Sequence, residues 1–165
     1  MSLFALQEAK ALGARVIATT SSPENAARLR ELGADEVIDY RASPEWGDQV
    51  RALTSGRGVD RVVEVGGPGT LAQSIKAVAY GGQVSLVGAL AADKGGMDFW
   101  SVFMSQAKFQ PIATGSRRDL EDLCRLMEQH QIRPVIDSVY SFDDAKAGWS
   151  HYAGRKVTGK VVFRH

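Results

Sequence analysis

The sequence predicts an α/β fold with a doubly wound, mostly parallel sheet covered by helices on both faces. Two features lead to this prediction. Short runs of apolar, mostly β-branched residues alternate along the chain with stretches whose apolar residues recur at helical spacing. Short links, many of them containing glycine, join these stretches, as in parallel strands connected by crossover helices. At 165 residues, the chain fits one domain that is long enough to bury a core.

The first part of the chain is expected to form helices and strands in turn. Residues 3–12 have apolar side chains at helical spacing and stop at Gly13, a residue type favoured just after a helix. Residues 15–19 form a continuous apolar run, which is typical of a strand buried on both faces. Ser22 is a good N-cap, and the proline after it suits the first turn of a helix that extends to residue 32.

The middle of the chain continues this alternation. Residues 36–40 are expected to form a strand, and residues 44–53 a helix with Ser43 as its cap. A strand over 60–65 then leads into a glycine-rich turn over 66–69. The next elements are a helix over 70–79 closed by Gly81 and Gly82, a buried strand over 83–87, a loop over 89–98 and a short helix over 99–106.

The last part of the chain keeps the same order of elements. The apolar runs predict strands over 109–114, 135–140 and 160–163, and the helical spacing predicts helices over 119–129 and 143–152. The strand–helix alternation therefore extends from one end of the sequence to the other.

Small residues gather where four of the expected strands end. In parallel sheets, ligands bind beyond the carboxyl ends of the strands, and glycine and serine let a ligand approach the backbone closely. A single glycine more often only makes a turn, but four strand ends of the same kind predict a ligand groove. These ends are residues 19–22, 66–67, 88–89 and 114–116.

Composition and charge exclude several classes of protein. The 20 Lys and Arg residues nearly balance the 19 Asp and Glu residues, for a net charge of +1, so the sequence has no basic excess for nucleic acid. No apolar run approaches the roughly 20 residues of a membrane-spanning helix. The single cysteine, Cys124, excludes an internal disulfide framework and a multi-cysteine zinc site. We expect a cytoplasmic protein in which Cys124 is a small, buried apolar residue of a helix and no nucleophile.

Three segments carry a resemblance to a known family. LFALQEAKALGARVIATTSSPENAARLRELGADEVIDY (3–40), GVDRVVEVGGPGTLAQSIKAVAYGGQVSLVGAL (58–90) and DSVYSFDDAKAGWSHYAGRKVTGKVVF (137–163) resemble the coenzyme-binding domain of medium-chain dehydrogenases/reductases. That family includes zinc-dependent alcohol dehydrogenases and zinc-free quinone oxidoreductases. The resemblance implies a Rossmann-type sheet and hydride transfer between a nicotinamide cofactor and an alcohol or carbonyl, a quinone or an enone. We also expect a homo-oligomer, because the family's first strand is absent from this sequence and unpaired strand edges favour association.

The sequence departs from the family pattern at its start. In the family, a strand and a Gly-rich turn of the G-x-G-x-x-G/A type precede the helix that is expected here over 3–12, and this sequence shows neither. The family's catalytic domain, with the substrate pocket and the zinc ligands, is also missing. We therefore expect residues 1–165 to be a truncated NAD(P)-binding domain that is inactive by itself. We also expect its central sheet to close by direct pairing of 15–19 with 60–65, or through the tail at 160–163, with self-association.

The resemblance implies a set of cofactor-binding residues. The adenosine end would be bound by Thr20, Ser21, Ser22, Asn25 and Tyr40. The ribose would be bordered by Val65 and Gly66, and the nicotinamide lined by Val87, Gly88 and Ala89. The carboxamide or pyrophosphate would face Ala113, Thr114 and Gly115, with Ser116 beside them, and a phosphate would meet Lys160.

The end of the strand at 15–19 favours NADP over NAD. NAD enzymes usually place an acid there for the ribose hydroxyls, and that acid would repel a 2′-phosphate. This sequence has hydroxyl side chains over 19–22 instead, and its first acid is Glu24. The resemblance argues in part against NADP, because relatives that prefer it often carry a lysine where this chain has Asn25.

No residue is assigned a catalytic or metal-binding role. The three histidines match no metal spacing, and no serine, threonine or aspartate forms a recognisable triad. Two alternatives remain open. One is a nucleotide-binding or regulatory module without catalysis; the other is a Rossmann-like methyltransferase, which Glu64 near a strand end followed by glycines would suit.

Overall fold

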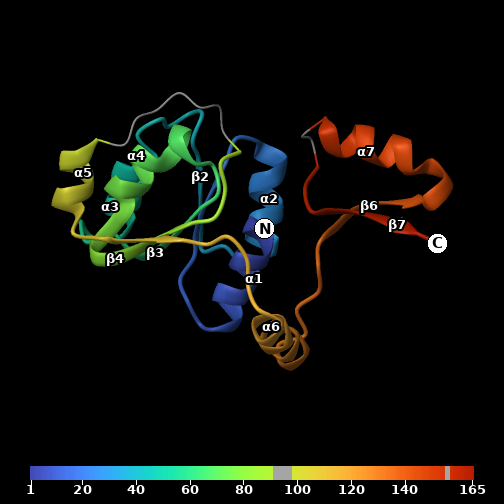
Figure 1. The fold of residues 1–165 in the computed structure, drawn as a ribbon. Coiled ribbons are helices and arrows are strands. Elements are labelled where there is room, and N and C mark those ends of the chain that lie inside the picture. Colours follow the sequence, from blue (N-terminus) through green and yellow to red (C-terminus); the bar gives the residue numbers. More distant parts are fainter. Residues whose placement is uncertain (91–97, 155–156) are drawn as a thin grey trace. The chain divides into compact units, whose positions relative to one another are not determined.

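The computed structural model describes residues 1–90, 98–154 and 157–165 (Figure 1). The chain divides into two compact units, Met1–Asp122 and Leu123–His165, and each is described by itself. The first unit contains α1 (Ser2–Ala11), β1 (Ile17–Thr20), α2 (Pro23–Glu31), β2 (Glu36–Asp39), α3 (Trp46–Leu53), β3 (Val59–Glu64), α4 (Pro68–Ala77), β4 (Val78–Leu86), α5 (Phe99–Ser105) and β5 (Lys108–Pro111). The boundary between the units falls within α6 (Arg117–Gln129).

The first unit contains two parallel sheets. β1 pairs with β2, and β4 lies between β3 and β5. The α/β alternation and the parallel strands confirm the predicted fold class, and most elements begin and end within two or three residues of the predicted bounds. The predicted loop over 89–98 falls largely on residues 91–97, which lie outside the described residues.

Two apolar clusters hold the first unit together. In one, Leu71 and Ile75 of α4 pack on Val78 and Val84 of β4. The other joins Ile38 of β2 to α3 and α4, which lie side by side (Figure 1). Full burial of one such aliphatic side chain contributes about 1.5 to 3 kcal/mol. On α4, the covering residues Leu71 and Ile75 lie one helical turn apart, as expected for the buried face of a helix.

Two local predictions are wrong. Ser43 does not cap α3, which begins two residues later than expected; the Ser43 hydroxyl instead accepts a hydrogen bond from the Gln49 side chain (2.7 Å). Gly81 and Gly82 do not close α4, because the helix ends at Ala77 and Val78 is already extended. Both glycines lie inside β4, where its pairing with β3 shifts register, and the positive φ of Gly81 (+74°) suits that irregular stretch.

The predicted closure of the central sheet is also not found. β1 pairs only with β2, and β3 pairs only with β4, among the residues that the structure describes. Side chains link the two sheets instead, since Ile17 and Val59 both pack on the cluster around Ile38. Among the described residues, the C-terminal strand over 160–164 pairs with the strand over 136–141 of its own unit and with neither β1 nor β3. Association between two copies stays a prediction.

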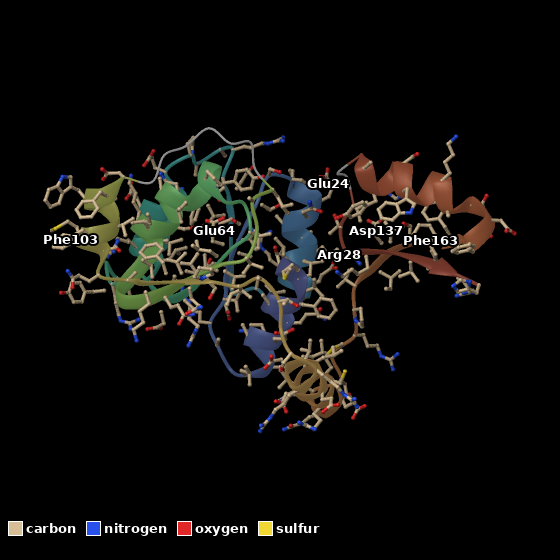
Figure 2. All side chains as sticks on the ribbon, in the orientation of Figure 1. Glu24, Arg28, Glu64, Phe103, Asp137 and Phe163 are labelled. Atoms are coloured by element: carbon tan, nitrogen blue, oxygen red, sulfur yellow. The ribbon has the colours of Figure 1, made fainter. Side chains whose placement is uncertain are left out.

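The second unit is a small parallel pair of strands with one helix on it. β6 (Ile136–Ser141) pairs with β7 (Lys160–Arg164), and the 3₁₀ turn Phe142–Asp144 leads into α7 (Ala145–Ala153). Gly148 lets α7 approach the sheet, because a Cβ there would lie 2.5 Å from the Phe163 ring. Asp137 and Phe163 mark the two strands in Figure 2.

The prediction for Cys124 is wrong, because its side chain is exposed. It lies on α6, a helix in which no described residue is buried. Helical spacing shows which residues share a face but not whether anything covers that face. No described helix is long and apolar enough to cross a membrane.

Candidate functional site

The candidate site lies at the carboxyl ends of the parallel strands. Because the strands within each sheet run in the same direction, their ends meet at one edge. Two groups of residues follow from this arrangement, one after β1 and β2 and the other after β3 and β4.

The first group contains the residues predicted to bind the adenosine end. Thr20 is buried at the end of β1, and its carbonyl accepts a hydrogen bond from Tyr40 N–H, just after β2 (3.0 Å). The Ser22 hydroxyl caps α2 by accepting from Asn25 N–H (3.2 Å), as the sequence predicted. Ser21 lies between these residues in the chain. The fold therefore brings all five predicted residues of this end together.

An acidic side chain stands beside this group. The Ser22 hydroxyl donates a hydrogen bond to Glu24 Oε2 (2.6 Å), and this bond is the main cause that lowers the pKa of Glu24 below 4.5. Glu24 is in the first turn of α2, and Arg28 follows one turn later on the same helix (Figure 2). A carboxylate here repels a phosphate and so opposes the sequence argument for NADP.

The second group contains the residues predicted to border the ribose and nicotinamide. Glu64 O, at the end of β3, accepts from Val87 N–H (2.8 Å) and Gly88 N–H (3.2 Å), and Leu90 N–H donates to Val65 O (3.3 Å). These bonds bring the turn over 65–67 against the turn over 87–89. A Cβ on Gly67 would lie 2.6 Å from Ala89 Cα, so the two turns touch at backbone level.

Glycine is required at Gly67 for a second reason. Its backbone has φ +84° and ψ −142°, a conformation that is essentially confined to glycine. A Cβ on Gly88 would likewise lie 2.7 Å from Val65 O. Glycine at these two positions therefore lets the turns over 65–67 and 87–89 approach each other at backbone level, with no side chain between them.

Sequence reasoning noted Glu64 only as support for the methyltransferase alternative and did not predict that this acid is buried beneath the second group. Glu64 is only 3% exposed, and Figure 2 shows it within the first unit between strand and helix. Its Oε1 accepts from Gly67 N–H (2.8 Å) and the Thr70 hydroxyl (2.6 Å), and its Oε2 accepts from the Ser74 hydroxyl. The signal was present as an acid at the end of a buried strand, with two hydroxyl residues four apart on the next helix.

Two sets of predicted residues are not joined to either group. Ala113, Thr114 and Gly115 are exposed after β5, whose end is tied to β4 by Ile112 N–H donating to Leu86 O (2.9 Å). Lys160 belongs to the second unit, where it begins β7. Their assigned roles stay predictions.

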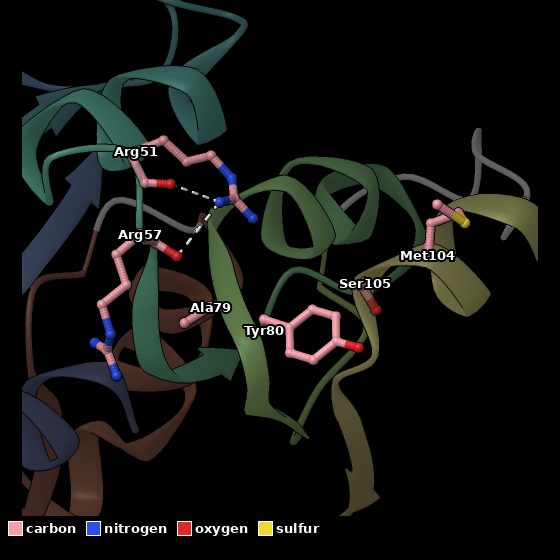
Figure 3. Close-up of a pocket in the computed structure, with 7 residues that line it drawn as sticks. Arg51, Arg57, Ala79, Tyr80, Met104 and Ser105 are labelled. Atoms are coloured by element: carbon pink, nitrogen blue, oxygen red, sulfur yellow. Dashed lines mark hydrogen bonds between the residues drawn. The ribbon is translucent and has the colours of Figure 1, made fainter.

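The pocket found in the first unit lies elsewhere. It encloses about 400 Å³ near the amino ends of β3 and β4, and Figure 3 shows its residues. Arg51 is not available to a ligand there, because its guanidinium donates to the carbonyls of Gly56 (2.8 Å), Lys76 (2.7 Å) and Val78 (2.9 Å). Arg57 is paired with Asp60. The pocket therefore offers little free charge for recognition and lies at the wrong edge for the candidate site.

A metal site is not part of this arrangement. Within 1–90, 98–154 and 157–165, no three His, Cys, Asp or Glu side chains are placed to hold a metal ion. The residues predicted for the adenosine and nicotinamide ends of a dinucleotide lie in the two groups at the strand ends.

Comparisons with known proteins agree with this geometry. The family model described as "Zinc-binding dehydrogenase" matches residues 1–129. A zinc-type alcohol dehydrogenase-like protein of Schizosaccharomyces pombe is 34% identical over 99% of this chain and 49% of its own length. Other curated relatives are a quinone oxidoreductase and an acryloyl-coenzyme A reductase.

Solved structures show the same fold. The crystal structure of an NAD-dependent alcohol dehydrogenase superposes with a TM-score of 0.91 and 36% identity, over 99% of this chain and 48% of that one. A mycobacterial protein complexed with NADPH superposes with a TM-score of 0.84 and 28% identity, over 99% of this chain and 53% of that one. The chain thus spans about half the length of the proteins it matches. It belongs to the zinc-binding dehydrogenase family and corresponds to the coenzyme-binding domain of medium-chain dehydrogenases/reductases.

Proposed function

We propose that residues 1–165 are the NAD(P)-binding part of an oxidoreductase that transfers hydride between a nicotinamide and an alcohol or carbonyl, a quinone or an enone. The contact between the turns over 65–67 and 87–89 at the ends of β3 and β4 is the main support for this proposal. The family and its oxidoreductase members support the reaction class. The bound nicotinamide supplies the redox chemistry, and the protein holds its ring toward the substrate.

Each end of the site has its own task in this proposal. Thr20, Ser21, Ser22, Asn25 and Tyr40 bind the adenosine end. Val65 and Gly66 border the ribose, and Val87, Gly88 and Ala89 line the nicotinamide. Ala113, Thr114, Gly115 and Lys160 are secondary candidates for the carboxamide and phosphates.

We propose a preference for NADPH over NADH. The support is that hydroxyl side chains, and no acid, end β1 and lead into α2, where they can donate to a 2′-phosphate. The Glu24 carboxylate, bonded to Ser22, reduces this preference. Among the solved structures that resemble this chain, one is an NADPH complex and another is described as NAD-dependent.

Calorimetric titration with NADPH, NADH and S-adenosylmethionine tests the proposal. We expect weak binding of NADPH and weaker binding of NADH. NADH binding tighter by about tenfold, a difference of roughly 1.4 kcal/mol, would contradict the cofactor preference. Binding of S-adenosylmethionine alone would favour a methyltransferase.

The chain by itself is proposed to be inactive. The substrate-contacting groups would come from the part of the relatives' length that this chain does not span. Mixed with NADPH and a panel of aldehydes, quinones and enones, it should not oxidise NADPH above background. Protein-dependent oxidation would mean that substrate groups lie within these 165 residues.

Self-association is proposed as the way in which the edges of β1 and β3 gain partners. Unpaired strand edges favour pairing with another chain. Light scattering should show a species larger than one chain. A monomer at all concentrations tested would contradict this part of the proposal.

A further inference from the structure

Glu64 is a buried acid whose hydrogen-bond partners are neutral. Its carboxylate accepts from one backbone N–H and two hydroxyl groups, those of Gly67, Thr70 and Ser74. Ser74 is as deeply buried as Glu64 itself. Three donors converging on one carboxyl group suit its negatively charged form, which accepts only.

The same residue joins both turns of the nicotinamide end. Its side chain fixes Gly67 and the first two turns of α4, while its main-chain carbonyl fixes Val87 and Gly88. The carboxylate also lies at the N-terminus of α4, where the helix dipole stabilises negative charge. The turn over 65–67 therefore has little freedom to move against the turn over 87–89.

The negative charge of the Glu64 carboxylate would act on a nicotinamide ring bound at the two turns. The oxidised nicotinamide ring carries a positive charge, and the reduced ring is neutral. A buried carboxylate is screened less than a surface one, so it attracts a nearby cation over several ångströms. Both turns proposed to border the ring are bonded to the residue that carries this charge.

We propose that Glu64 is a positioning residue of the dinucleotide site that holds both turns in place and makes the site favour oxidised over reduced nicotinamide. This inference rests on the proposed function. It adds a determinant of redox preference to the binding residues.

The test uses Glu64→Gln, which keeps the size of the side chain and one acceptor oxygen but removes the charge. NADP⁺ and NADPH are titrated separately into the wild-type chain and the variant, and the ratio of the two dissociation constants is compared. We expect the variant to lose about fivefold of the preference for NADP⁺, as for a charge several ångströms from the ring. A residue that only supported the fold would weaken both ligands equally and leave the ratio unchanged.

Asp60→Asn is the matched control. Asp60 lies on the same strand, four residues earlier, at the exposed end and paired with Arg57. Four residues of strand correspond to about 13 Å, so this variant removes an equal charge far from the site and should keep the wild-type ratio.

A second measurement does not depend on the ligand. Amide hydrogen exchange at Gly67 should speed up in Glu64→Ala, because the carboxylate that accepts the Gly67 N–H is gone. If the Gln variant fails to melt cooperatively, Glu64→Asp replaces it. That variant keeps the charge, so it should keep the preference for NADP⁺ while losing protection at Gly67.

The outcomes separate the two proposals. If the wild-type chain binds the dinucleotides and the ratio does not change in Glu64→Gln, the inference is overturned and the proposed function stands. Unchanged exchange in Glu64→Ala also overturns it. If the wild-type chain binds neither NADP⁺ nor NADPH, the proposed function fails and the redox preference fails with it.

Discussion

The two groups of strand ends are built by different means. After β1 and β2, the hydrogen bonds are local in sequence: the Ser22 hydroxyl caps α2, and the Thr20 hydroxyl accepts from Ser22 N–H. After β3 and β4, side chains are largely absent, and two turns some twenty residues apart in sequence are held together by one buried acid. The first group is a local structure that would tolerate change, whereas the second depends on long-range contacts and close backbone approach.

The sharpest test of this contrast is Gly67→Ala, which should cost about 3 kcal/mol of unfolding free energy. The new Cβ would require a glycine-only backbone conformation and would meet Ala89 Cα at 2.6 Å. Urea denaturation measures the loss.

Gly56→Ala is the control for that experiment. Gly56 also has a positive φ (+83°), but a Cβ there meets nothing within 4 Å. Its substitution should cost only about 1 to 2 kcal/mol from backbone strain. Equal losses in the two variants would mean that the contact between the turns contributes nothing.

Ser74→Ala should destabilise the second group by about 2 kcal/mol. The substitution removes a buried donor to the Glu64 carboxylate and leaves that acceptor with one partner fewer. Ser43→Ala, which removes a hydroxyl that meets only the Gln49 side chain near the surface, should change stability by less than about 0.5 kcal/mol. Thermal or urea unfolding of both variants measures how much the buried hydrogen bonds around Glu64 contribute to the free energy of unfolding.

Glu24→Gln should strengthen NADPH binding about threefold and leave NADH binding unchanged. The pKa of Glu24 is lowered by its bond to Ser22, so the group is charged at neutral pH and would repel a 2′-phosphate. Glu31→Gln, at the other end of α2, is the control and should alter neither affinity. An equal gain for NADH would show that Glu24 does not face the 2′ position.

The smallest effect concerns acid stability near β1 and β2. The Lys10 side chain, and next the Val16 N–H, lower the pKa of Asp35 below 3.8. A lowered pKa contributes stability that is present above the unfolded value and is lost as the pH falls through the folded one. Asp35→Asn should therefore be less stable than the wild type at neutral pH, with the gap closing below about pH 4. Urea midpoints from about pH 6 to pH 2.5 measure this; a gap independent of pH would contradict it.

Local signals were enough for much of the fold. Ser22 and Pro23 predicted the start of α2, and apolar runs predicted the strands of the first unit to within a few residues. Local signals failed where pairing with a neighbouring strand determined the structure. Gly81 and Gly82 were assigned to a helix end but belong to an irregular stretch of β4, which pairs with β3. Cys124 was expected to be buried but is exposed. The prediction failed because helical spacing does not show whether another element covers a given face of α6.

By itself, the sequence determined the order of elements, the fold class and the position of the strand ends, because these follow from residue periodicity and from glycine and cap chemistry that act over a few residues. Only the tertiary structure decided that Glu64 is buried beneath two turns, that the turns touch, and that β1 and β3 remain unpaired with each other. Those features depend on contacts between residues far apart in the chain. Burial matters for Glu64 because a buried carboxylate is screened less by water and salt than an exposed one.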